Sequence, residues 1–173
     1  MSRARERRGA APPEDRAGAL KERVYATFTG LAIVLVQLGN VGHLTAERAV
    51  GTLAVGIIAI SAAGFVAEVI AHTSVHGAFP RGVELATMLR VSGGALASAF
   101  VPVLLLLLAA LGRLQLETAL RAGSIVYIVT LAVIGYLAVR RTSLRWWQQL
   151  LALGLLVALG LGVVGLQQLA HAH

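Results

Sequence analysis

Glu68, His72 and His76 are the residues of this sequence whose types and spacing are best suited to chemistry. They follow one another at intervals of four in an otherwise apolar stretch, so on a helix they lie on roughly one face at successive turns. A carboxylate with imidazoles is a reasonable ligand set for a divalent transition metal. The outer two are separated by about 12 Å along the helix axis, so one ion cannot bind all three. The alternative is that the histidines simply mark a polar boundary where the helix ends.

The composition indicates what surrounds these residues. Hydrophobic residues make up 57% of the 173-residue chain, charged residues only 13%, and the mean hydropathy is +0.79. Soluble domains carry about 25% charge, and a chain of this length folded in water would be unable to hide so much apolar surface. We therefore expect an integral membrane protein with the lipid bilayer as its solvent. There are no cysteines, which excludes disulfides and thiolate metal sites.

Five uncharged stretches, of which the second is residues 49–67, are each close to the ~20 residues that a membrane-spanning helix needs. We predict an all-α, polytopic bundle of five transmembrane helices within residues 24–170, at 24–42, 49–71, 91–112, 122–139 and 146–170. A four-helix alternative requires one run, the weakly flanked fourth, to be re-entrant. Residues 1–23 are predicted to be a disordered, basic cytoplasmic arm, and residues 171–173 a short tail. Thr45 is expected to cap the second helix, and Gly77 and Gly112 to close the second and third.

The distribution of basic residues predicts the orientation, because cytoplasmic segments are enriched in Lys and Arg. With the amino terminus in the cytoplasm, the outer side carries only Arg48, Arg113 and Arg121, and the other basic residues lie inside. An odd number of spans then places the carboxyl terminus outside. The basic residues that give the net charge of +7 lie between apolar runs rather than together on one folded face. No nucleic acid is therefore expected as a partner.

Glu68 is predicted to lie near the cytoplasmic end of the second helix. A charged carboxylate costs about 2.5–3.5 kcal/mol at mid-membrane and less toward the interface, so it should face protein or water. Carboxyl groups removed from water take up protons more readily, which makes proton coupling feasible. The alternative is that Glu68 reaches the headgroups or pairs with an arginine such as Arg81. We find no catalytic or cofactor-binding motif, so we expect neither an enzyme nor a bound cofactor.

Small residues provide candidate packing faces, because helices approach closely in lipid only where side chains are small. The second helix has Gly56, Ala59, Ala63 and Ala67 at intervals of three or four, and the fifth has Gly154, Ala158 and Gly162 at intervals of four. An Ala- and Gly-rich chain also produces such stripes by chance.

Nearly the whole hydrophobic region resembles the vacuolar iron transporter-like family of five-helix membrane proteins, and two segments can be compared with that family's motifs. The segment from Arg23 to Leu31 is similar to the family's first-helix signature, with Gly30 and Leu31 matching its Asp-Gly-Leu triplet and Thr29 in place of the aspartate. The segment from Ala63 to Ala71 is similar to the family's Ser-Met-x-x-Gly-Glu-Tyr stretch, with Glu68 in place of its glutamate. The family's cytoplasmic metal-binding insertion between helices two and three is missing.

The resemblance implies a homodimer in a bacterial inner membrane that moves ferrous or manganous ions out of the cytoplasm in exchange for protons. By this analogy Glu68 and Thr29 are the transport and proton-coupling residues, and their positions in the sequence place them at similar depth. Glu68, His72 and His76 remain the candidate metal contacts because of their spacing. The only metal expected is the transported divalent ion. The alternative is a structural or regulatory membrane protein, derived from that family, that no longer transports.

Overall fold

All the secondary structure in the described part of the chain is helical. The structure, a computed structural model, describes residues 13–140. In that range the elements are α2 (Pro13–Gly39), a 3₁₀ turn η1 (Val41–His43), α3 (Ala46–His76), α4 (Val83–Ala97), α5 (Phe100–Ala110) and α6 (Leu116–Arg140), with no β-strand. The predicted all-α class is confirmed for these residues. The predicted fifth span at 146–170, with its small-residue stripe, and the 171–173 tail lie outside them.

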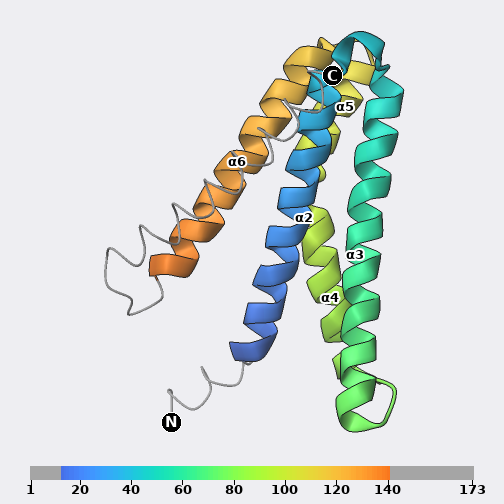
Figure 1. Cartoon of the computed structure of the whole chain (residues 1–173), viewed down its shortest axis with the longest axis vertical. Coiled ribbons are helices and arrows are strands. Elements are labelled where there is room, and N and C mark those ends of the chain that lie inside the picture. The colour runs from blue at the N-terminus through green and yellow to red at the C-terminus, as the bar shows by residue number, and fades with distance from the viewer. Residues whose placement is uncertain (1–12, 141–173) are drawn as a thin grey trace, which may run out of the picture.

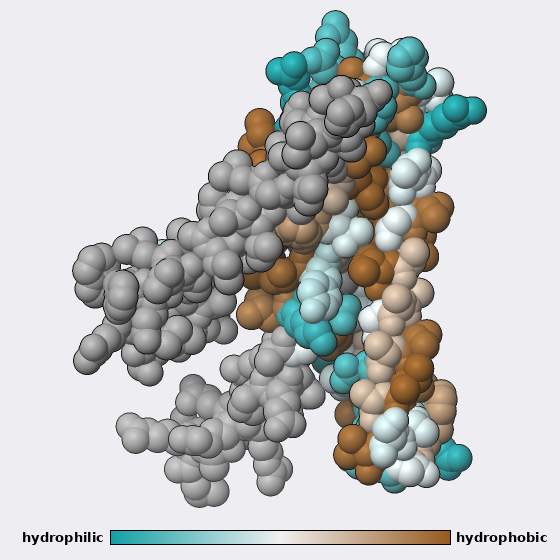
Figure 2. Space-filling model, viewed as in Figure 1, coloured by the Kyte–Doolittle hydropathy of each residue, from teal (hydrophilic) through white to brown (hydrophobic). Residues whose placement is uncertain are grey.

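Two of these helices are long and apolar enough to cross a membrane, namely α3 and residues Leu116–Leu137 of α6. Only 17% of the apolar window of α3 and 28% of that of α6 are buried, whereas the core helix of a soluble protein is covered on most sides. Figure 2 shows hydrophilic residues gathered at the end where α2 joins α3, and mainly apolar or neutral residues along α3 below it. These features support a membrane location.

The first helix begins eleven residues earlier than predicted. Residues 13–23, assigned from the sequence to a disordered arm, form the first turns of α2. The sequence does contain a start signal, since proline is favoured at the first position of a helix, and the acids that follow Pro13 interact well with the positive end of the helix dipole. The density of arginines and alanines concealed that signal.

The predicted third span is divided into two helices. α4 ends at Ala97 and α5 begins at Phe100. Pro102 lies in the first turn of α5, where it has no N–H to donate and its ring crowds the carbonyl group four residues earlier. Together α4 and α5 cover residues 83–110, so the chain crosses the bundle once here, but as a discontinuous helix.

The predicted helix ends are confirmed. The hydroxyl of Thr45 accepts a hydrogen bond from the Arg48 amide at 3.4 Å at the start of α3. Gly77 ends α3 in the left-handed conformation, with φ of 64°, and Gly112 follows α5 with φ of 70°. Glycine adopts this conformation without steric cost. The α2–α3 and α5–α6 connections lie at one end of the bundle and the α3–α4 connection at the other (Figure 1).

α2 is the central helix, packing against α3, α4 and α6. Glycines allow two of its close approaches. A methyl group on Gly30 of α2 would lie 2.5 Å from the Tyr127 ring of α6, and one on Gly56 of α3 would collide with Ile33 of α2. The other residues of the predicted α3 stripe, Ala59, Ala63 and Ala67, are exposed in the bundle, so they are available to a further helix.

Candidate functional site

One face of α3 is turned toward α2 and α4, and three of its residues identify it. Ser61 is only 4% exposed. A methyl group on Gly64 would collide with the carboxylate of Glu22 from α2, and His72 Nε2 lies 3.4 Å from Glu84 Oε2 of α4. Residues three, four and seven apart share a face of a helix, so these three residues define the inner face of α3.

Glu68 lies on this inner face, four residues after Gly64 and four before His72, but its side chain is exposed. A residue that is turned toward neighbouring helices can be exposed only where those helices stand apart. Figure 1 shows α2 and α3 diverging toward the end that carries the α3–α4 connection. Glu68 is therefore exposed at this end of the bundle. We call the exposed polar area around it the Glu68 opening and define it by Glu22, Glu68, His72 and Glu84.

Two charged side chains of α2, the half-buried Glu22 and the exposed Arg23, lie against glycines of the neighbouring helices. Glu22 lies against Gly64 of α3. Arg23 lies against α4, where a methyl group on Gly94 would be 3.4 Å from the guanidinium Nε. Because glycine has no side chain, these long polar groups fit between the helices. The two charges form a polar boundary between the Glu68 opening and the packed interior.

Buried hydroxyl groups follow beyond this boundary. Thr27 is 0% exposed, and its Oγ1 donates to the carbonyl oxygen of Arg23 at 2.6 Å. The Ser61 hydroxyl is buried and has no hydrogen-bond partner among the described residues. The Glu22–Gly64 and Ile33–Gly56 contacts fix the antiparallel register of α2 and α3, and both hydroxyls lie between these contacts. A polar layer therefore lies about two turns deeper than Glu68.

Thr29 is half-buried on α2, on the side that faces α3, because it is seven residues from Glu22 and four from Ile33. The register places it opposite about residues 57–60 of α3, so Glu68 lies at least eight residues away, or about 12 Å along the axis. The similar depth expected for Thr29 and Glu68 is therefore not found, and one ion would not contact both in this arrangement.

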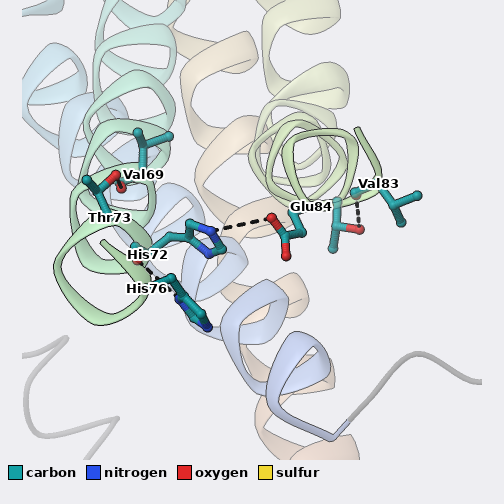
Figure 3. Close-up of polar contacts among 7 residues, drawn as sticks. Val69, His72, Thr73, His76, Val83 and Glu84 are labelled. Atoms are coloured by element: carbon teal, nitrogen blue, oxygen red, sulfur yellow. Dashed lines mark hydrogen bonds and ion pairs between the residues drawn. The ribbon is translucent and has the colours of Figure 1, made fainter. Parts of the chain in front are cut away.

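The two histidines lie at the end of α3, where His72 faces Glu84 of α4 (Figure 3). Their rings are stacked, with centroids 4.3 Å apart and an interplanar angle of 20°. His76 Nδ1 is 3.2 Å from the carbonyl oxygen of His72 and donates to it in the tautomer that carries the proton there. The His72 side chain is 13% exposed and that of Glu84 is 59% exposed, so their contact joins α3 and α4 at the rim of the opening.

The structure thus places Glu68 and His72 on one face and brings His72, rather than Glu68, against His76. Within residues 13–140, no three His, Asp or Glu side chains are close enough together to hold a metal ion. The His72–Glu84 pair offers two ligands of the types that divalent metals accept. Coordination of a metal ion by three or more side chains in residues 13–140 would require side chains to move or groups from elsewhere to join the His72–Glu84 pair.

Sequence reasoning missed Glu22, Thr27 and Glu84. Glu22 was assigned to the disordered arm, although its position seven residues before Thr29 is a helical interval. Thr27 falls on the same face as Arg23 and Leu31, at intervals of four, which a periodicity count would reveal. The pairing of Glu84 with His72 depends on how the chain turns between α3 and α4, and no local pattern encodes it.

Comparison with known proteins gives no match to any family model, curated protein or solved structure. The resemblance to the vacuolar iron transporter-like family therefore rests on the two segments in α2 and α3 described above.

Proposed function

We propose that this chain is a multi-pass membrane protein that transports a cation, with Glu68 as the group that binds the cation and exchanges it for a proton. The observation that carries the proposal is the exposure of Glu68 on the inner face of α3. A carboxylate held among membrane-spanning helices is costly, and it commonly marks the path of an ion. Its exposure at one end of the bundle suits a site that is reached from one side of the membrane.

The discontinuous α4–α5 helix supports the same function. Broken helices in membranes are tolerated where the interrupted backbone is covered by protein or lines a cavity, and secondary transporters often build their substrate sites beside them. Here Ala99, at the interruption, is 4% exposed. The proposed path runs from the Glu68 opening past Glu22 and Arg23 to the buried hydroxyl layer, with Thr29 on its α3-facing side.

The finer assignments complete the proposal. Five spans with the amino terminus in the cytoplasm put the Glu68 opening on the cytoplasmic side of a bacterial inner membrane. The exposed Ala59, Ala63 and Ala67 suit the close helix contact of a homodimer. Ferrous or manganous ions are the proposed substrates, on the basis of the family resemblance and of the adjacent imidazole of His72.

Metal uptake into proteoliposomes tests this function. With an imposed pH gradient, wild-type protein should move iron, manganese, zinc or cobalt, and Glu68→Gln should reduce the flux at least tenfold because it removes the exchangeable proton. Glu47→Gln is the matched control, since Glu47 is an exposed acid in the first turn of the same helix. Equal flux in wild type and Glu68→Gln would eliminate the role of Glu68. No flux of any of these metals under any pH gradient would favour the non-transporting structural or regulatory alternative.

A further inference from the structure

An apolar groove lies on the outside of the bundle, away from the Glu68 opening. It has a volume of about 410 Å³ and runs between α3, α4 and α5. Its lining includes Ala54, Ile58, Gly93, Ala97, Phe100 and Val103. Ile58 is 58% exposed and Phe100 is 69% exposed, so the groove is open to the surroundings of the protein. A methyl group on Gly93 would meet nothing within 4 Å.

The groove has the length of one lipid chain in one leaflet. From Gly93 to Val103 the α4–α5 segment advances ten residues, which is at most about 15 Å because the helix is interrupted between Ala97 and Phe100. Half of a hydrocarbon core of about 30 Å has the same thickness. The lining contains no charged residue, so a hydrocarbon chain can make apolar contacts along the whole length of the groove.

A cation lies at one end of the groove. Arg90 of α4 is three residues before Gly93 and seven before Ala97, so it shares their face of the helix. Arg90 is exposed, and no ion pair joins it to an acid among the described residues. It also lies at the predicted cytoplasmic boundary, where anionic headgroups are attracted by basic residues.

We propose that this groove binds an anionic phospholipid, with one acyl chain along Gly93, Ala97 and Phe100 and the phosphate on Arg90. The charge of Arg90 complements the phosphate, and the apolar channel that begins one turn above it accepts the chain. The proposal rests on the membrane embedding proposed above, but it does not depend on transport. The break between α4 and α5 shapes the groove, because Ala99 and Phe100 on either side of the α5 start both line it.

The test uses the full chain in phosphatidylcholine vesicles with spin-labelled phosphatidylglycerol or phosphatidylcholine, the nitroxide being near the end of the acyl chain. Wild-type protein should immobilise labelled phosphatidylglycerol about fivefold more strongly than labelled phosphatidylcholine, because one arginine at the membrane surface attracts an anionic lipid by about that factor. Arg90→Gln should bring this preference close to one, whereas Arg81→Gln, which changes an exposed arginine outside the groove, should retain it. Gly93→Phe should reduce the number of immobilised chains of both lipids, and Gly51→Phe, at another helical glycine with open space, should not.

Circular dichroism establishes that each variant keeps its helices. A preference that survives Arg90→Gln, or an unchanged number of immobilised chains in Gly93→Phe, overturns the proposal. No immobilised lipid with any variant would contradict the membrane embedding itself. Loss of metal flux with Glu68→Gln, together with unchanged lipid binding by that variant, would show that the two proposals concern separate sites.

Discussion

At the scale of single residues, the contact between Gly30 and Tyr127 joins α2 to α6 so closely that no side chain fits at position 30. A methyl group there would lie 2.5 Å from the ring Cζ and the hydroxyl oxygen of Tyr127, whose side chain is fully buried. Such contacts are how small residues bring membrane helices together. The family resemblance includes Gly30, and the structure gives that glycine a packing role that requires no ligand.

Replacing Gly30 by alanine should therefore destabilise the bundle. We expect Gly30→Ala to lower stability by about 1–3 kcal/mol, the usual cost of overpacking, measured by unfolding in detergent. Gly51→Ala should cause no loss, because nothing lies within 4 Å of its added methyl group. In a Tyr127→Leu background the Gly30→Ala change should cost less, since the ring atoms it meets are absent. An equal cost in both backgrounds would show that the ring is not the obstacle.

Glu68 illustrates how far residue-level prediction reaches. The sequence identified it as the acid most in need of protein or water, because its neighbours are apolar and it lies within a membrane-length helix. The sequence did not reveal that Gly64 receives Glu22, or that Glu84 meets His72, because both contacts depend on how two helices are aligned. Helix period determines which residues share a face, whereas the partner of that face is a property of the packed bundle.

At the scale of elements, the helix ends were predictable and one interruption was not. Thr45, Gly77 and Gly112 act locally, through a side-chain cap and left-handed backbone conformations, so the sequence alone identifies them. The break between α4 and α5 lies in a continuous apolar run, in which hydropathy gives no sign of an end. The sign of the break in the sequence is Pro102, which lacks an amide donor and crowds the preceding turn.

Pro102 provides the test at this scale. Pro102→Ala restores an amide donor and removes the ring, so α4 and α5 should join into one helix. The absence of native cysteines allows nitroxide labels at Leu89→Cys and Leu107→Cys, both at exposed positions. Their separation should increase in Pro102→Ala toward about 27 Å, the rise of eighteen helical residues. The control is Val103→Ala, which should leave the distance between the two labels as it is in the parent chain. If Pro102→Ala also leaves this distance unchanged, packing alone maintains the break.

At the scale of the whole molecule, the alternation of connections at the two ends of the bundle matches the predicted succession of spans within residues 13–140. The orientation relative to the cytoplasm is an inference from the basic residues, whose asymmetry is large because only Arg48, Arg113 and Arg121 lie at the proposed outer end. Single cysteines at Gly42→Cys and Ala78→Cys mark opposite ends of α3, and both positions are exposed.

A membrane-impermeant maleimide applied to spheroplasts should label Gly42→Cys directly and Ala78→Cys only after permeabilisation. The cysteine-free parent chain should remain unlabelled in both conditions. The opposite pattern would invert the proposed orientation, and labelling of both positions from one side would contradict the crossing of α3.

The length of α3 has a consequence for how a cation would reach Glu68. Its 31 residues extend about 46 Å. At the usual tilt of about 20°, the helix spans about 44 Å along the bilayer normal, which matches the full bilayer thickness of about 40–45 Å including headgroups. The His72 end of α3 then lies among lipid phosphates rather than in bulk water. A leaflet potential of about −30 mV concentrates divalent ions there roughly tenfold. If the chain transports a divalent metal as proposed, its apparent affinity for that metal should increase with the anionic lipid content of the vesicles.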